Sequence, residues 1–462
     1  MRKGAVHYSI KDQIGIRFDA SYHLSDSLIV KRKISSSPYE MLTLKDVSSD
    51  IFYGNRAKRI YVTNRDKGIP FLSSSDILQA DLENVKLASK KYTPCIEQMM
   101  LRKGWTLISR SGTIGNCAFA NAKHAQKLAS EDVIRLVPNN ILRGGLVYAY
   151  LASKHGHSLL TQGTFGAVIQ HIEPNFIASL PIPKFPDVFQ QEVDDLIHES
   201  ARLREEAAKA LKDAIIILSD YVNAKLSQAK CKTSVVNIQD IRKSLQQRID
   251  PPALMNEGVE AMQEVISRLP YKLLGELGVV VRRPGIFKRI YVENGIPYIK
   301  GSEIFLTNPF QRCEHLSKTR TPFIDEMKLK EGQILVTCAG SCGNIKMITR
   351  EYEEKQSIGS QDIIRIDSSD ELTGNLINKE YLFTYLQLPF VYSYIQSMKY
   401  GSVIERIEPF HVESIPVVVP PQELSCKIQD KIRNYMNATY KAFNAEEKAI
   451  KLVEKEIEKW NN

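Results

Sequence analysis

The sequence predicts an α+β chain of two tandem β-rich α/β domains, each followed by a long helix, with the two helices packed as an antiparallel coiled coil. Two observations support this prediction. The segment GAVIQHIEPNFIASLPIP at 166–183 returns as GSVIERIEPFHVESIPVV at 401–418, with eight identical residues in eighteen positions. Each copy is followed by a run with apolar residues at three- and four-residue spacing. We therefore predict an internal repeat with pseudo-twofold symmetry.

The repeat extends along the whole chain in one order, with matching segments roughly 230 residues apart. The matches are RFD 17–19 with RID 248–250, KRIYV 58–62 with 288–292, GIPFLSSSDI 68–77 with GIPYIKGSEI 295–304, LRKGWTLISRSGTIGN 101–116 with LKEGQILVTCAGSCGN 329–344, and SEDVIRL 130–136 with SQDIIRI 360–366. This order defines four parts of the chain. They are a first domain over 1–186, a first helix over 187–228, a second domain over 229–421 and a second helix over 422–462.

Short apolar segments between Gly, Ser, Asn and Asp turns predict the strands of both domains. They are RIYV, IPFL, WTLIS and VIRLV in copy one, and RIYV, IPYI, QILVT and IIRI in copy two. A short helix is predicted over 145–160 and again over 379–398. Residues 229–247 form a polar connection into the second copy.

A proline-rich segment precedes each long helix, LPIPKFP at 180–186 and IPVVVPP at 415–421. Proline ends the preceding structure because it fixes φ and disfavours helix at the residue before it. Neither following run contains Gly or Pro, so each helix can span about 40 residues, or roughly 60 Å. A single apolar stripe on such a helix needs a partner, and we predict that the two helices cover each other.

Composition indicates a soluble globular protein, with 43% hydrophobic and 25% charged residues. No apolar run approaches a membrane span, and the N-terminus MRKGAVHYSIKDQ lacks an apolar secretory signal, so no membrane contact is expected. Seven scattered cysteines fit reduced thiols, which predicts a cytoplasmic protein. A net charge of +9 favours a polyanionic partner and equally fits an ordinary basic cytosolic protein.

Catalytic signatures are absent from the sequence. It has no P-loop, HExxH, GxSxG or glycine-rich loop for S-adenosylmethionine, so no catalytic residue and no cofactor is predicted. TNPFQR at 307–312 is interpreted as a turn, and the group of Asp325, Glu326 and Lys328 as a surface turn. Cys338 and Cys342 have no second Cys or His pair nearby, which favours semi-buried thiols over zinc ligands.

Basic and hydroxyl side chains in equivalent loops are the candidates for DNA contact. Lysine and arginine neutralise phosphates, arginine also reads guanine edges, and glycines let a backbone approach closely. For each single residue an ordinary solvated charge or a structural turn is at least an equal alternative, and for the loops together the preference for DNA rests on the family resemblance that follows. The candidates are Arg56, Lys58, Arg59, Arg110, Ser111 and Thr113 in copy one, and Arg282, Arg283, Lys288, Arg289 and Lys300 in copy two.

The whole chain resembles the specificity (S) subunits of type I restriction-modification systems. The resemblance rests on GIPFLSSSDI/GIPYIKGSEI, on SRSGTIGN/TCAGSCGN, and on the two closing segments with their long helices. It implies two target-recognition domains on antiparallel spacer helices, which read a bipartite, asymmetric site in double-stranded DNA. It also implies binding to two methyltransferase (M) subunits, recruitment of restriction (R) subunits, and no chemistry or cofactor in the chain itself.

The sequence departs from the family where a Glu-Gln pair usually starts each helix. Copy one has Phe189 and Gln190 there, and copy two has Leu424 and Ser425, which puts the M-subunit contacts at this place in doubt. Recognition is expected in the most divergent segments, 78–100 and 305–328, and in the basic loops. Three alternatives stay open: a specificity subunit of a system whose cleavage and methylation partner is fused, a protein-interaction scaffold, and a methyltransferase or nuclease.

Overall fold

The computed structural model describes residues 27–56, 58–162, 164, 171–226, 237–243, 247–368 and 377–461. Contacts divide the chain into two compact units: unit 1 is Met1–Glu205 with Lys441–Asn462, and unit 2 is Glu206–Tyr440. Three predicted features lie wholly or partly outside the described residues: RFD at 17–19, the start of the closing segment at 166–183, and most of the connection at 229–247.

In the described part of unit 1, the first sheet has the order β2-β9-β6-β7 and is antiparallel throughout. Its strands are β2 (Ser48–Tyr53), β9 (Val133–Pro138), β6 (Thr106–Ser109) and β7 (Cys117–Phe119). The second sheet has the order β3-β5-β4-β8, in which β4 and β8 are parallel. Its strands are β3 (Tyr61–Val62), β5 (Leu87–Ser89), β4 (Gly68–Leu72) and β8 (Leu128–Ala129).

Unit 2 has a first sheet of the same plan, in the order β12-β18-β15-β16 and antiparallel throughout. Its strands are β12 (Val280–Arg282), β18 (Ile363–Asp367), β15 (Ile334–Thr337) and β16 (Ile345–Met347). A second sheet joins β14 (Glu314–Leu316), β13 (Tyr291–Ile299) and β17 (Ile358–Gly359), in that order. The predicted strands are thus confirmed, except that RIYV and IPYI of copy two lie in one strand, β13, with a register shift.

Each proline-rich segment contains a short strand in addition to ending the structure before its long helix. β10 (Pro181–Pro183) pairs with β1 (Met41–Thr43) in unit 1, and β19 (Pro416–Val418) pairs with β11 (Tyr271–Leu273) in unit 2. Buried tyrosines fix both strands from inside, because Tyr150 Oη donates to Pro181 O at 2.8 Å and Tyr385 Oη donates to Pro416 O at 2.9 Å. A buried phenol needs such an acceptor, so each hydroxyl holds its strand against the helix behind it.

The helices predicted over 145–160 and 379–398 are each two helices: α4 (Gly144–Ala152) with α5 (Lys154–Gln162), and α13 (Lys379–Leu386) with α14 (Pro389–Ser397). The prediction of one helix was wrong for local reasons. Ser153 Oγ donates to Tyr150 O at 2.6 Å and accepts from Gly156 N at 3.1 Å, which ends one helix and starts the next. Pro389 holds Leu388 in an extended conformation at ψ 137°.

The remaining short helices connect or cover these sheets. They are α2 (Ser27–Ser35), α3 (Ile96–Met99), α6 (Pro174–Ala178), α8 (Ile238–Lys243), α9 (Pro251–Leu254), α10 (Glu257–Arg268), α11 (Ile324–Met327), α12 (Arg350–Glu354) and α15 (Pro409–Glu413). Within the described residues, none of the helices is both long and apolar enough to cross a bilayer.

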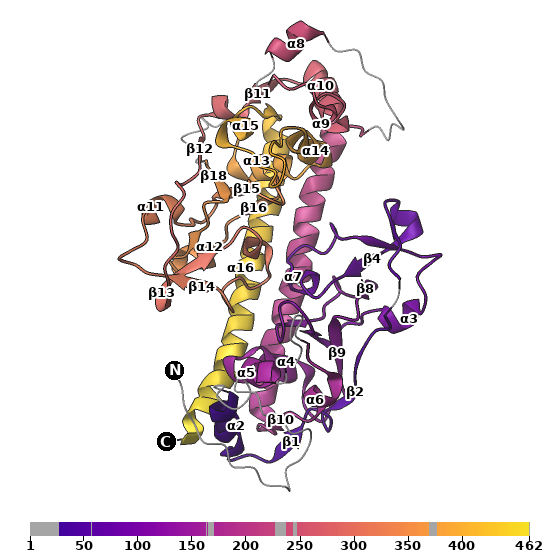
Figure 1. Ribbon diagram of the computed structural model, residues 1–462, viewed down its shortest axis with the longest axis vertical. Coiled ribbons are helices and arrows are strands. Elements are labelled where there is room, and N and C mark those ends of the chain that lie inside the picture. Colours follow the sequence, from indigo (N-terminus) through magenta and orange to yellow (C-terminus); the bar gives the residue numbers. More distant parts are fainter. Residues whose placement is uncertain are drawn as a thin grey trace. The chain divides into compact units, whose positions relative to one another are not determined.

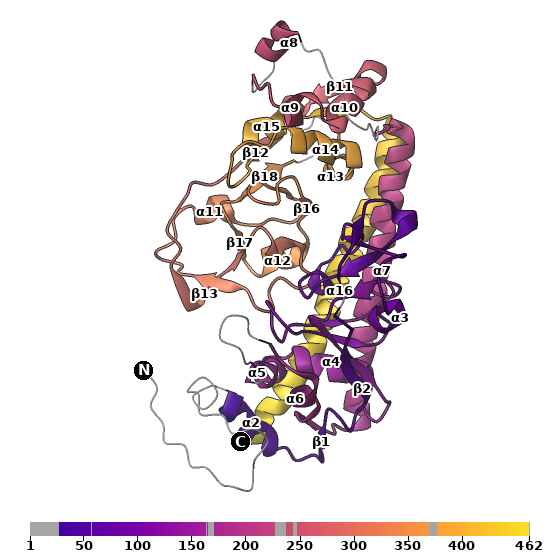
Figure 2. The same cartoon turned by 45° about the vertical axis from the view of Figure 1, so that its right-hand side comes forward.

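Two long helices, α7 (Asp187–Val222) and α16 (Gln422–Glu458), begin where the periodic runs predicted them, and each is one continuous helix (Figures 1 and 2). The predicted end at 228 was wrong for α7, because Asn223 has a φ of +48° and residues 223–226 are not helical. Each contributes residues to both units. In unit 1 the apolar residues of α7 and α16 belong to the same core as those of α4. Helix α4 is buried along nearly its whole length. The long-helix residues of that core are Val193, Ile197, Ala201, Ala449, Ile450, Val453 and Ile457.

Candidate nucleic-acid interface

The turn SRSGTIGN joins β6 to β7 in unit 1 and is held by its own hydroxyls. Ser109 Oγ lies 2.9 Å from Thr113 Oγ1 and donates to Ser111 O at 3.1 Å. Gly112 has a φ of +73°, and a Cβ added there would meet no atom within 4 Å. The tip is therefore a rigid, exposed backbone segment that another molecule can approach closely.

The matching turn TCAGSCGN joins β15 to β16 in unit 2 and has the same construction. Asn344 N donates to Thr337 Oγ1 at 3.0 Å, and Thr337 Oγ1 donates to Ser341 O at 2.5 Å. Gly340 has a φ of +71° and open space at its Cβ position. Both units thus present the same tip although five of the eight residues differ, which agrees with a shared scaffold at this place.

Arg110 does not extend from its turn into solvent. Its side chain is 15% exposed, its Nη2 lies 2.5 Å from Glu173 Oε1, and its guanidinium lies 4.6 Å from the ring centre of Tyr53. The ion pair and the ring contact tie the turn to β2 and to the residue before α6. The structure therefore gives Arg110 a bracing position; its predicted role in DNA contact stays a prediction.

Arg283 provides the equivalent ion pair in unit 2, from the end of β12 instead of from the turn. It follows β12 at the position that corresponds to Tyr53, and its Nη1 lies 2.9 Å from both carboxylate oxygens of Glu408. Burial opposes the charge of Glu408, but hydrogen bonds from Tyr400 and Arg283 hold its pKa below the ordinary value. Cys338 occupies the place of Arg110 on the turn, so the arginine of the ion pair directly follows β12 in unit 2 and lies on the turn in unit 1.

Arg56 and Arg59 of unit 1 converge on one carboxylate, that of Glu131. Arg59 Nη2 lies 2.8 Å from Glu131 Oε2, and Arg56 Nε lies 3.8 Å from Glu131 Oε1. Burial lowers the pKa of Arg59, but Glu131 and its neighbours raise it further, so the net shift is upward. Arg56 is 91% exposed and remains available to a phosphate, whereas Arg59 is partly neutralised.

The predicted basic residues of unit 2 are also mostly paired. Arg282 Nη2 lies 2.8 Å from Asp367 Oδ2, and Arg289 Nε donates to Tyr298 Oη at 2.8 Å. Lys300 Nζ lies 2.7 Å from Glu314 Oε2. Lys58 and its counterpart Lys288 differ, because both are exposed and neither forms an ion pair with any residue that the structure describes.

Two buried arginines were missed by sequence reasoning. Arg135 of β9 and Arg365 of β18 are 0% exposed and donate to backbone carbonyls instead of carboxylates. Arg135 binds Ser130 O, Val133 O, Met99 O and Ala129 O, and Arg365 binds the equivalent carbonyls of unit 2. Burial lowers the pKa of each to about 10. The only signal was the shared arginine in VIRL and IIRI.

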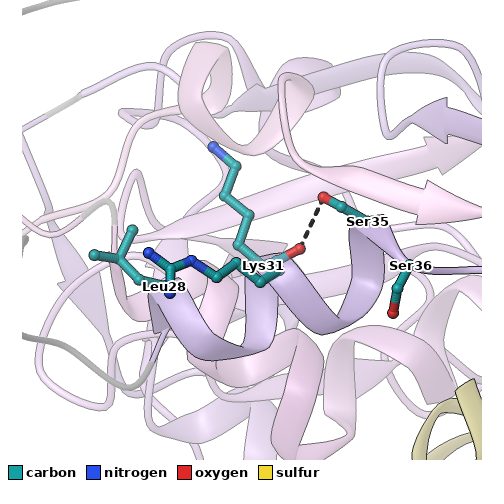
Figure 3. A pocket seen from close by; sticks show the side chains of 5 residues that line it. Leu28, Lys31, Ser35 and Ser36 are labelled. Atoms are coloured by element: carbon teal, nitrogen blue, oxygen red, sulfur yellow. Dashed lines mark hydrogen bonds between the residues drawn. The ribbon is translucent and has the colours of Figure 1, made fainter. Parts of the chain in front are cut away.

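The described residues hold no group of three or more His, Cys, Asp or Glu side chains that could bind a metal ion. Cys338 and Cys342 are buried, and burial raises the pKa of Cys338 to about 12, as expected for inert thiols. A surface hollow of about 440 Å³ lies against α2 and is lined by Leu28, Lys31, Arg32, Ser35 and Ser36. Figure 3 shows Leu28, Lys31 and Ser35 on α2 and Ser36 directly after it; Ser35 Oγ donates to Lys31 O at 2.9 Å.

Comparison with known proteins identifies the second half of the chain most directly. Residues 271–455 match the family model described as type I restriction modification DNA specificity domain. A search of curated protein sequences found no match.

The solved structures that are similar to the chain include an S subunit, an HsdS subunit and a type IIG restriction endonuclease. The S subunit of a type I restriction-modification system from M. genitalium has 13% identity and a TM-score of 0.35, and covers 91% of this chain and 96% of its own. The HsdS subunit from Thermoanaerobacter tengcongensis has 13% identity, a TM-score of 0.29 and the same coverages. The type IIG restriction endonuclease BpuSI has 13% identity and a TM-score of 0.29, over 38% of this chain and 28% of its own.

Proposed function

Through residues 271–455 the chain belongs to the family of type I restriction modification DNA specificity domains, and on this premise we propose that it reads a bipartite, asymmetric site in double-stranded DNA. In this proposal two methyltransferase subunits bind the chain, and restriction subunits join them. The chain acts in the cytoplasm, binds no cofactor and does no chemistry itself. The single observation that carries the proposal is the family match over most of unit 2.

The two equivalent sheets support a bipartite target. Unit 1 has the order β2-β9-β6-β7 and unit 2 has the order β12-β18-β15-β16, with the exposed turn between the last two strands in each case. The turns carry different residues, SRSGTIGN and TCAGSCGN, and the segments 78–100 and 305–328 have diverged further. Two recognition surfaces on one scaffold, with different side chains, would read two different half-sites.

The long helices are proposed as antiparallel coiled-coil spacers over 187–228 and 422–462, between target-recognition domains over 1–186 and 229–421. Two contacts support the antiparallel direction. Ser200 Oγ donates to Ala442 O at 2.8 Å, and Asp213 Oδ2 lies 3.2 Å from Lys431 Nζ. The residue number on α16 falls as that on α7 rises, as two helices of opposite direction require.

The proposal is tested by binding labelled DNA to the purified chain with and without its methyltransferase partner, over a range of salt concentrations. A DNA-reading subunit predicts a complex whose log affinity falls linearly with log salt concentration, and tighter binding to one sequence than to random DNA. Binding of the partner without any DNA affinity would favour the protein-interaction scaffold. Methyl transfer or cleavage by the chain alone would favour the enzyme, and one partner polypeptide that both cleaves and methylates would favour the fused system.

A further inference from the structure

A tight hairpin over residues 400–406 lies beside the exposed turn of unit 2. Tyr400 and Arg406 exchange two backbone hydrogen bonds, of 3.0 and 2.8 Å, which close the hairpin at its base. Gly401 has a φ of +102°, and a Cβ there would lie 2.6 Å from Ile404 O. Only glycine fits this position, so the conformation of the hairpin depends on Gly401.

The tip of this hairpin is apolar and almost fully exposed to solvent. Val403 is 93% exposed, the highest value among the exposed large hydrophobic residues of the described chain, and Ile404 beside it is 53% exposed. Single exposed apolar residues are common on protein surfaces. Val403 and Ile404 differ from such single residues, because they are adjacent at the end of a hairpin. Both are β-branched, so their side chains have little rotational freedom.

The hairpin and the turn TCAGSCGN are fastened to each other. Gly340 N donates to Glu405 O at 3.1 Å, and Cys342 Sγ donates to the same oxygen at 3.2 Å. Ile407 N donates to Cys338 O at 3.1 Å. The tip and the turn are therefore held together as one element.

Glu408 fixes this element to the sheet. It accepts hydrogen bonds from Arg283 at 2.9 Å and from Tyr400 Oη at 2.8 Å. Arg283 follows β12, and Tyr400 forms the base of the hairpin. The hairpin is thus connected through Glu408 to the end of a sheet strand.

The size and shape of the tip decide what it can contact. A protein interface requires about 800 Å² on each partner, far more than two side chains on a convex tip provide. An apolar wedge in DNA requires only one or two such side chains, inserted between base steps from a groove. Arg406 at the base adds a positive charge next to the tip, as a phosphate contact requires.

We propose that Val403 and Ile404 insert as an apolar wedge into a groove of the half-site that unit 2 contacts and unstack one base step there. This inference rests on the proposed function, because it assumes that unit 2 binds DNA. Such a wedge responds to how easily the DNA base step is deformed and does not read base edges. It therefore contributes to affinity at a step that no polar side chain needs to contact.

The test uses the complex of the full chain with its methyltransferase partner and a duplex that carries the recognition motif found by methylation mapping. 2-Aminopurine is placed at each position in turn, because its fluorescence rises when it is unstacked. In the wild-type complex the fluorescence should rise at one base step. The double variant Val403→Ser with Ile404→Ser should not show this rise at saturating protein concentration, and it should bind the duplex about tenfold more weakly. The control Val280→Ser changes a 48% exposed valine of β12 and should keep both properties.

The outcomes separate the wedge from the proposed function. Unchanged fluorescence and affinity in a folded double variant would overturn the wedge and leave DNA binding intact. If the double variant loses methyltransferase binding but keeps the fluorescence pattern, the tip contacts a protein, and the proposed wedge is overturned. Failure of the wild-type complex to bind the mapped motif would overturn the proposed function itself. Circular dichroism of each variant establishes that it is folded.

Discussion

Arg283 and Glu408 form an ion pair in unit 2 in which one nitrogen, Nη1, lies 2.9 Å from both carboxylate oxygens. Unit 1 has the same carboxylate position, Glu173, but its arginine comes from the turn, at Arg110. Each unit thus keeps the ion pair while the arginine occupies a different element. The feature common to both units is an arginine paired with the glutamate that precedes α6 or α15.

We predict that Arg283→Ala destabilises unit 2 by about 3 kcal/mol, because it leaves Glu408 partly buried without its charged partner. The double variant Arg283→Tyr with Cys338→Arg copies the arrangement of unit 1 and should recover at least half of that loss. Urea unfolding followed by circular dichroism measures both values. A double variant no more stable than Arg283→Ala would show that the two arrangements are not equivalent.

Arg365 gives a second prediction about stability. Arg365→Met removes the donor from carbonyls of Gly359, Ile363 and Met327, and each buried carbonyl left unpaired costs about 1–3 kcal/mol. Arg365→Lys should rescue little, because a single ammonium lacks the planar fork that reaches several carbonyls. The exposed Arg320→Ala is the control and should stay within about 0.5 kcal/mol of wild type. Rescue by lysine would contradict the assignment.

Much of this fold could be predicted from the sequence, because its strands and long helices are marked by local periodicity and turn residues. The ion pairs could not be predicted, because Arg110 and Glu173 are 63 residues apart and Arg283 and Glu408 are 125 apart. The breaks at Ser153 and Leu388 were missed because the apolar pattern continues across them. The candidate DNA contacts were chosen by residue type and by their place in equivalent loops, which does not distinguish the paired Arg289 from the unpaired Lys288.

His124 makes the stability of unit 1 dependent on pH. Burial lowers its pKa from 6.5 to about 3, and its ring is bonded in the neutral form to Ile77 O at 3.2 Å. The unfolded chain therefore binds a proton more readily than the folded unit, and stability falls as pH drops from 6.5 towards 3. The two tryptophans, Trp105 and Trp460, lie in unit 1, so their fluorescence follows its unfolding.

The matched variant is His124→Gln, which removes the titration. Its unfolding free energy should depend less on pH between 6.5 and 4 than that of the wild-type chain, although its value at pH 7 is lower. Equal pH slopes in the two proteins would show that His124 is not the titrating group.

The unpaired lysines should dominate the salt dependence of DNA binding. Lys58→Ala and Lys288→Ala should each reduce the slope of log affinity against log salt concentration by about one, because each removes one phosphate contact. Arg59→Ala and Arg289→Ala remove cations that already have carboxylate neighbours and should change the slope less. Anisotropy titrations at four salt concentrations measure all five slopes. The reverse order would place the arginines, and not the lysines, on the phosphates.

The proposed function requires that this chain selects the DNA sequence that a methyltransferase modifies. The most direct measurement is long-read methylation mapping in a methylation-free host that expresses the methyltransferase partner with or without the chain. We predict a new motif of two short, different half-sites separated by unread bases, present only with the chain. A motif that is unchanged when the chain is absent would contradict the claim.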